Sequence, residues 1–171
     1  MNVQFYIEKL KDSKEFKEFA KENPKAYLCS GFFVLDKEKS KNPDNKVHLD
    51  FYNPETHKAF SFEMKDEVKI VPLENFTKVP SGINEGIEFD FDDIEGIISV
   101  EMQKNSVKEK IQKIILSMSN SEGKNIINAV VFISMLGMLK INISLPDKKV
   151  TEFEKKSFFD MFKVIKKEKK S

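Results

Sequence analysis

The first half of the chain has the hydrophobic pattern of a helix followed by strands. Residues 3–22 repeat apolar side chains at helical spacing, and a capping-box spacing that begins at Asp12 predicts a break there. A continuous apolar run over 26–36 predicts a buried strand. Strict alternation on both sides of an Asn-Pro-Glu-Thr turn predicts a hairpin over 47–64. A shorter strand is expected at 68–71, directly before a proline.

The second half repeats this order after a linker, which is predicted over 73–103 with extended pieces at 87–91 and 94–100. The strongest helical pattern of the chain runs over 106–118, with apolar residues at i, i+4, i+7, i+8 and i+11. Ser106 and Glu109 have the spacing of a capping box at its start. Three strands are then expected, at 126–136, 139–145 and 150–153.

The C-terminus is basic and amphipathic. A last helix is predicted over 157–167, with a frayed tail at 168–171. Seven lysines between 155 and 170 alternate with Phe158, Phe159, Phe162 and Ile165. Such a helix either contacts a membrane or another anionic surface, or packs on the sheet with its lysines in solvent. The pattern leaves both interpretations open.

These elements predict one domain over 1–171 made of two similar halves, at about 3–72 and 104–156. A constant offset of 92 lays the alternating strand that begins at Val47 on the one that begins at Leu139. The expected fold class is α+β: two α-β-β-β repeats form a curved antiparallel sheet with helices packed on one face, and a C-terminal helix follows.

Composition narrows the chemistry. The chain has 171 residues, 40% of them hydrophobic, with 16 phenylalanines, which is enough to form a core. All 29 basic residues are lysines, and the net charge is +1. Without arginine the chain lacks the planar fork that reads bases and grips phosphates, and a near-neutral charge attracts nucleic acid weakly. We therefore expect no strong nucleic-acid signal, although the lysine-rich tail keeps weak, salt-dependent binding as a third hypothesis.

Targeting signals and metal motifs are not evident. The N-terminal residues lack the apolar core of a signal peptide, and the longest apolar stretch, 129–139, is too short to span a bilayer. We expect a cytoplasmic protein without a membrane span. A single cysteine excludes an internal disulfide and a multi-cysteine zinc site. No cofactor and no metal site are expected.

The hairpin turn carries a resemblance to a known family. The segment from Tyr52 to Lys58, Tyr-Asn-Pro-Glu-Thr-His-Lys, resembles the strand–turn–strand signature of PepSY-like domains, in which a D-P-x-T-G-K turn commonly joins the last two strands. His57 stands where that signature has glycine. The chain also resembles uncharacterised archaeal proteins with a Tyr-Leu-x-x-x-Phe-Phe strand, here 27–33. The resemblance implies a cystatin-like α+β architecture and a role in binding or restraining partners, proteases among them. PepSY-like domains are usually extracytoplasmic.

Two groups of residues could carry chemistry. Cys29 with His48 or His57 suggests a thiol–histidine pair, but a cysteine inside an apolar run usually behaves as a small buried hydrophobe. Five carboxylates between 88 and 95 could serve a hydrolase or bind a cation, but their spacing fits no EF-hand loop. We favour a solvated strand edge or the start of a helix as the explanation of these carboxylates. No catalytic residue is predicted.

The sequence therefore favours a non-enzymatic binding or scaffold domain that acts through the surface or a free edge of its sheet. Its expected partner is a protein, and a homodimer is a further option. Aromatic residues predicted at the contact are Tyr27, Phe51, Tyr52 and Phe76. The alternative is a small-ligand carrier or small enzyme with a pocket between sheet and helices, which a solid interior would exclude.

Overall fold

The protein is an α+β domain in a computed structural model that describes residues 2–39, 41–74, 78–84 and 86–168. Its centre is one open, antiparallel, eight-stranded sheet with the order β4-β3-β2-β1-β5-β6-β7-β8. The elements are, in chain order, α1 (Val3–Asp12), α2 (Lys14–Glu22), β1 (Tyr27–Asp36), β2 (Lys46–Asn53), β3 (Lys58–Met64), β4 (Val68–Leu73), α3 (Phe91–Lys104), β5 (Ile111–Ser121), β6 (Lys124–Ile133), β7 (Gly137–Ser144), β8 (Lys149–Ser157) and α4 (Phe158–Glu168).

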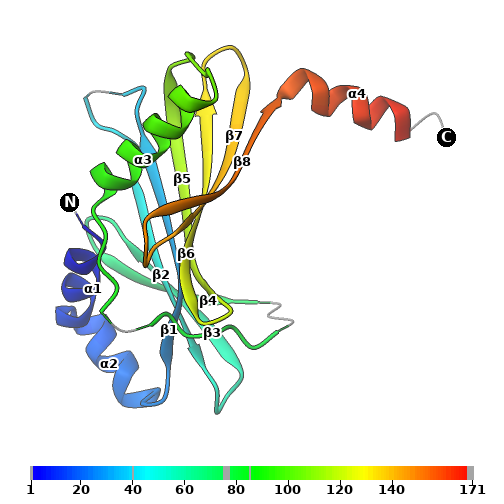
Figure 1. Ribbon diagram of the computed structural model, residues 1–171. Coiled ribbons are helices and arrows are strands. Elements are labelled where there is room, and N and C mark those ends of the chain that lie inside the picture. Colours follow the sequence, from blue (N-terminus) through cyan, green and yellow to red (C-terminus); the bar gives the residue numbers. More distant parts are fainter. Residues whose placement is uncertain (1, 40, 75–77, 85, 169–171) are drawn as a thin grey trace.

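The helices α1, α2 and α3 lie on the same side of the curved sheet, and α4 stands away from the body (Figure 1). The predicted break in the N-terminal helix is confirmed. Ser13 caps α2, because its Oγ accepts the N–H of Phe16 at 3.2 Å and donates to the carbonyl of Leu10 at 2.7 Å. After this break, α2 packs on β2 and β3 through Phe16 and Phe19.

The prediction for residues 91–118 is wrong. The helix of this region is α3, which begins after the N-cap Asp90. Most of the segment predicted as a helix, 106–118, belongs to strand β5. The apolar run Ile114-Ile115-Leu116 fits a helical and an alternating pattern alike, and β-branched residues favour a strand. The extended piece expected at 94–100 is the middle of α3, whose buried residues follow at helical spacing: Phe91, Ile94, Ile98 and Met102.

Each half of the chain contributes helix and then four strands, whereas the predicted α-β-β-β repeat has three. In the first half the fourth strand is the one expected at 68–71, and in the second half it is β5, which takes the place of the predicted helix. The strands β1 and β5 pair at the centre of the sheet, and the last strand of each half, β4 or β8, forms an edge. The offset of 92 lays β2 on β7, which occupy different places relative to this central pair. The two similar halves and their origin in a duplication remain predictions.

Phenylalanines fill the interior between the helices and the sheet. The rings of Phe16 and Phe19 on α2 pack against Phe51 and Phe62 with centroids 5.0–6.2 Å apart. A second group joins the linker and α3 to β1, since Phe89 and Phe91 both contact the fully buried Phe33. Packing in the interior therefore accounts for these phenylalanines, whereas Phe5, Phe159 and Phe162 are exposed.

Candidate functional site

One edge of the sheet, the strand β4, is largely apolar. It pairs with β3 from Met64↔Val68 to Ala59↔Leu73, and no described strand pairs with its other side. Ile70 is 38% exposed and Val71 is 46% exposed, on opposite faces of the strand. An edge strand presents unpaired backbone N–H and C=O groups. Pro72 has no N–H, so the template on which a further strand can form is mainly residues 68–71.

The opposite edge, β8, carries charged side chains. Lys155 forms an ion pair with Glu109, and Lys156 pairs with Glu154 at 3.4 Å. Glu152 accepts a hydrogen bond from the amide of Asn142 on β7. Charges on an edge strand oppose the addition of another strand. β4 has one charged residue, Lys69, so it is the more open of the two edges.

A groove of about 480 Å³ lies beside β4, between α2 and the ends of β3 and β4. Its apolar lining is Phe19, Phe60 and Ile70. The α2 side contributes carboxylates, and all the acidic lining residues come from that helix: Glu15, Glu18 and Glu22. Lys58 of β3 is the one basic residue among these lining residues, so the carboxylates outnumber it. A groove of this kind fits a partner that combines apolar and basic side chains.

The four predicted contact residues do not form one surface. Phe51 is buried in the main core against Phe16. Tyr27 and Tyr52 lie in a separate small cluster with Cys29, and the Tyr27 hydroxyl donates to the carbonyl of Pro80 at 2.8 Å. Phe76 lies outside the described residues. The structure brings together only Tyr27 and Tyr52, whose ring centroids are 5.8 Å apart.

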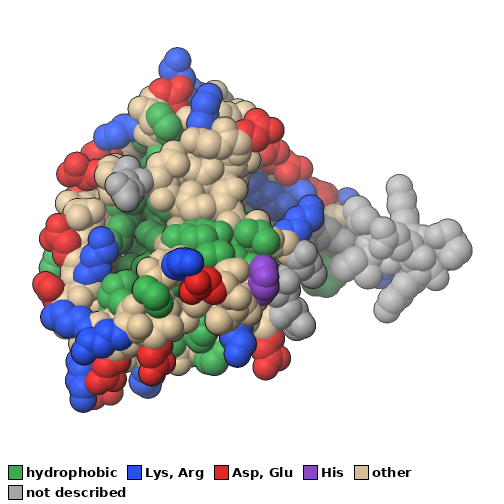
Figure 2. All heavy atoms as spheres, turned by 90° about the horizontal axis from the view of Figure 1, so that it is seen from below, with side chains coloured by type: hydrophobic (Ala, Val, Ile, Leu, Met, Phe, Trp, Pro, Cys, Tyr) green, Lys and Arg blue, Asp and Glu red, His purple; other side chains and the backbone are tan. Residues whose placement is uncertain are grey.

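A second hollow, of about 620 Å³, lies between the N-terminal helices, the sheet and the linker. Apolar residues from all three parts line it, among them Ile7, Phe16, Leu28, Phe51, Ile83 and Ile87. Polar side chains at this hollow are Gln4, Lys11 and Asn84. Figure 2 shows the molecule from below the view of Figure 1, with hydrophobic side chains in a recess and charged side chains around them. The space between the helices and the sheet is therefore partly open beside α1.

Cys29 and the histidines do not form a catalytic pair. The Cys29 Sγ donates to the backbone carbonyl of Asp50 at 3.3 Å, and burial raises the pKa of this thiol to about 12. His57 Nδ1 lies 3.1 Å from the Tyr52 hydroxyl, and His48 Nδ1 lies 3.4 Å from the Ser61 hydroxyl. His57 has a φ of 54°, the left-handed conformation that a glycine at this turn position would favour.

The carboxylates of 88–95 start a helix. The Asp90 side chain caps α3 by accepting the N–H of Asp92 at 2.8 Å, and this hydrogen bond lowers the pKa of Asp90. Asp93 pairs with Lys148 at 3.0 Å, and Glu95 pairs with Lys37. Among the described residues no group of His, Cys, Asp and Glu side chains is arranged to hold a metal ion.

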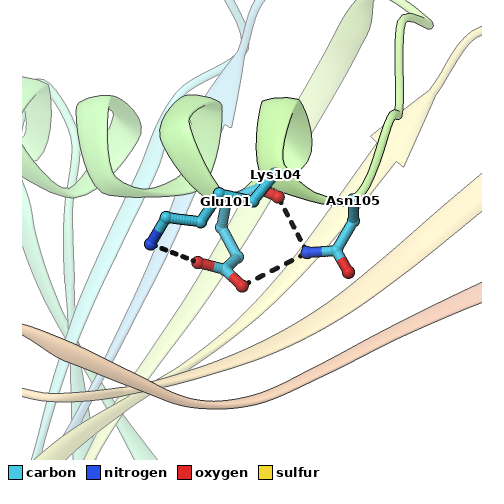
Figure 3. Close-up of polar contacts among 3 residues, drawn as sticks. All are labelled: Glu101, Lys104 and Asn105. Carbon is cyan, nitrogen blue, oxygen red and sulfur yellow. Dashed lines mark hydrogen bonds and ion pairs between the residues drawn. The ribbon is translucent and has the colours of Figure 1, made fainter.

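A third hollow, of about 780 Å³, separates α3 from the start of β8 and has a mixed acidic and basic lining. Figure 3 shows that Glu101 in this region is engaged by its own helix. Its carboxylate pairs with Lys104 Nζ at 3.3 Å and accepts a hydrogen bond from the Asn105 amide at 3.2 Å. Asn105 also donates to the Glu101 carbonyl at 2.9 Å, which closes the C-terminal turn of α3. This carboxylate therefore helps to hold the C-terminal end of α3.

The fold defines the class of this protein as α+β with a single eight-stranded antiparallel sheet. No family model matches the chain, and no curated protein matches it. Its structure is similar to that of a protein from Clostridium difficile 630 described as a "putative lipoprotein", with a TM-score of 0.47 and 10% sequence identity. That similarity covers 83% of this chain and 90% of the other. The resemblance to PepSY-like domains remains a prediction.

The sequence predicts no membrane-spanning segment, and one structural observation bears on this prediction. No described helix is both long and apolar enough to cross a membrane.

The site residues that sequence reasoning missed are those of β4 and its groove. The segment Val68 to Leu73 reads as a short strand, but its sequence does not give its place in the sheet. The α2 carboxylates belong to a repeating Lys-Glu pattern that is typical of a solvent-facing helix. The one local signal was Pro72, which restricts a strand to an edge or a bulge without giving the order of the strands.

Proposed function

We propose that this protein is a non-enzymatic binding domain that takes up an extended segment of a protein partner along β4. The observation that carries this proposal is the position of β4 as an apolar, unpaired sheet edge directly beside a groove. Backbone hydrogen bonds to β4 would supply affinity, and alternate side chains of the partner would supply specificity. The resemblance of the hairpin turn to that of partner-binding domains agrees with this proposal.

The groove defines what the bound segment should contain. Phe60 and Ile70 face the helix side of the sheet, where Phe19 of α2 lies. Partner side chains pointing to that side would meet this apolar lining first and the α2 carboxylates next. Because a strand alternates its side chains, the segment should place apolar residues and lysine or arginine at every second position. On the other face it meets Val71, which favours a further apolar residue.

The test uses a display library of unstructured peptides selected against the full chain. We expect the selected peptides to show the alternating apolar and basic pattern, and to lose about tenfold in affinity when Ile70→Lys places a positive charge in the apolar part of the groove, where it repels the basic residues of the peptide. The matched control is Thr151→Lys, which adds the same charge to the opposite edge strand and should leave affinity unchanged. Both variants are first compared with the native protein by thermal unfolding. Selected peptides that bind equally well to the Ile70→Lys protein would contradict the proposal.

A second function is favoured by the hollow beside α1. Its volume of about 620 Å³ falls within the usual range for small-molecule sites, and its lining combines many apolar side chains with few polar ones. A carrier of a small apolar ligand with one polar group would use this space. A ligand screen read by thermal unfolding tests it, because a ligand that binds only the folded state raises the midpoint. A hit whose effect disappears in Phe51→Trp, which fills the hollow, would support this second function.

A further inference from the structure

The turn between β6 and β7 has an unusual combination of residues and conformation. Met135 is 85% exposed and Leu136 is 57% exposed, and both have positive φ angles, 64° and 56°. Large apolar L-residues rarely adopt this left-handed conformation. The preceding turn in the chain, between β5 and β6, has a polar residue and a glycine at positive φ, Glu122 and Gly123. The β6–β7 turn thus keeps two apolar side chains in solvent where other residues would suit the backbone better.

Hydrogen bonds hold this turn in place. Ser134 donates its N–H to the carbonyl of Lys110 at 2.8 Å, and its Oγ accepts the N–H of Lys110 at 3.0 Å. The carbonyl of Leu136 accepts the N–H of Phe158 at 3.1 Å, which places the turn against the start of α4. Strained residues that the surrounding structure holds in one conformation are typical of functional positions.

The helix α4 adds further exposed apolar residues at the same end of the molecule. Phe159 is 62% exposed and Phe162 is 64% exposed. The first residue of the helix, Phe158, stacks on Phe132 of β6, and beyond this point α4 stands off the body (Figure 1). We call Met135, Leu136, Phe159 and Phe162 the apolar corner.

Lysines accompany the apolar corner. Lys110 lies beside the turn, and Lys163 and Lys166 lie on α4; all three are exposed. None of the ion pairs between described residues includes them, whereas lysines elsewhere, such as Lys148 and Lys155, are paired. Asp160 is the one exposed carboxylate among the described side chains of α4. The surroundings of the corner are therefore positively charged and complementary to an anionic surface.

We propose that the apolar corner inserts into the headgroup region of an anionic lipid bilayer and attaches this protein to the membrane surface. Phenylalanine, leucine and methionine with nearby lysines are the residue types of interfacial membrane contacts. The side chains project from a hairpin tip and from a helix that stands off the body. A bilayer adapts to such a convex surface, whereas a protein partner would need a matching hollow. β4 lies at the opposite edge of the sheet, so both surfaces can act at once.

The first experiment uses the lack of tryptophan in this chain. A single tryptophan is introduced as Phe162→Trp at the corner or as Val79→Trp in the linker, where Val79 is 65% exposed. Each full-length variant is mixed with vesicles of phosphatidylcholine alone or with about one third phosphatidylglycerol. We expect the Phe162→Trp emission to shift to the blue with anionic vesicles at low salt, to shift less at high salt, and to remain unchanged with neutral vesicles. The Val79→Trp emission should not change with either kind.

A second experiment separates binding from folding. In the double variant Met135→Asn with Leu136→Gly, both new residues tolerate the left-handed conformation, so the unfolding midpoint should not fall. Co-sedimentation with anionic vesicles should nevertheless fall by about fivefold or more, since the apolar area that enters the interface is reduced. Val79→Ser, which removes an exposed apolar residue outside the corner, should sediment like the native chain.

Three results would overturn the inference. One is the absence of a blue shift with anionic vesicles at low salt. Another is co-sedimentation that the double variant leaves unchanged. The third is a dimer, seen by light scattering, that the double variant dissociates while neither protein binds vesicles. In that case the corner would bind a second copy of the chain.

Discussion

Phe158 stacks on Phe132 with ring centroids 6.4 Å apart and planes inclined by 18°, and this contact attaches α4 to the outer face of the sheet. The two residues belong to different elements, β6 and α4. Since the following turns of α4 stand away from the body, the position of the helix depends on this pair and on the backbone hydrogen bond from Phe158 to Leu136.

Removing one ring should release α4 without unfolding the domain. In Phe158→Ala we expect faster hydrogen exchange throughout α4 and an unfolding free energy lower by about 1 kcal/mol, the usual contribution of an aromatic pair. Phe159→Ala is the control, because that ring is exposed and should leave exchange in α4 unchanged. A loss of protection in the sheet of the Phe158→Ala protein would show that α4 supports the core.

Three asparagines connect the linker to the β5–β6 hairpin. The buried Asn125 Oδ1 accepts the N–H of Asn84 at 3.0 Å and the amide of Asn120 at 3.1 Å. Asn125→Ala leaves the Asn84 N–H without its acceptor, so the free energy of unfolding should fall by about 1–3 kcal/mol. In a chain of this size that lowers the melting temperature by several degrees. Asn128→Ala on the same strand is the control and should have a smaller effect.

Two glycines should respond oppositely to alanine. Gly96 lies in the exposed middle of α3, and a Cβ there meets no atom within 4 Å, so Gly96→Ala should stabilise by about 0.5–1 kcal/mol. A Cβ on Gly31 of β1 would lie 2.9 Å from Met118 Cε and 3.0 Å from the buried Phe33 ring. Gly31→Ala should therefore destabilise by about 1–3 kcal/mol. Chemical denaturation measures the change in unfolding free energy of each variant. Equal changes in the two variants would contradict the packing described for Gly31.

The Cys29 thiol should make stability depend on alkaline pH. Burial raises its pKa to about 12, above the ordinary value of 9.0. The unfolded chain then loses this proton at lower pH than the folded chain does, so the contribution is complete below pH 9 and is lost as the pH rises towards 12. Tyrosines and lysines titrate in the same range, so the measured quantity is the difference in unfolding free energy between the native chain and Cys29→Ala. A difference that stays constant over this window would contradict the burial of the thiol.

The sequence carried enough information for the β2–β3 hairpin, where strict alternation and a proline turn agree. It was ambiguous at 111–118, because consecutive isoleucines satisfy the helical and the strand period equally. In the structure this segment pairs with β1 on one side and with β6 on the other, and these pairings favour the strand. The α3 helix was hidden because Gly96 and several β-branched residues weaken its helical signal.

The candidate site was less predictable than the fold. Whether a strand lies at an edge depends on the order of strands, which no local pattern encodes. The aromatic residues proposed as contacts, Phe51 and Tyr52, are mostly buried, because a ring on an alternating strand most often faces a core. The exposure of Met135 and Leu136 also follows from a turn conformation that their side chains would not suggest.

The most direct test of the proposed binding mode is amide hydrogen exchange of the full chain with and without a peptide selected from the display library. Addition of a strand to β4 would give its outward-facing N–H groups new acceptors. We therefore expect slower exchange at those residues of Val68–Leu73 whose N–H groups face outward, Pro72 excepted because it has no N–H, and little change at Lys149–Ser157 on the other edge. Unchanged exchange over Val68–Leu73, with protection gained elsewhere, would contradict binding at this edge.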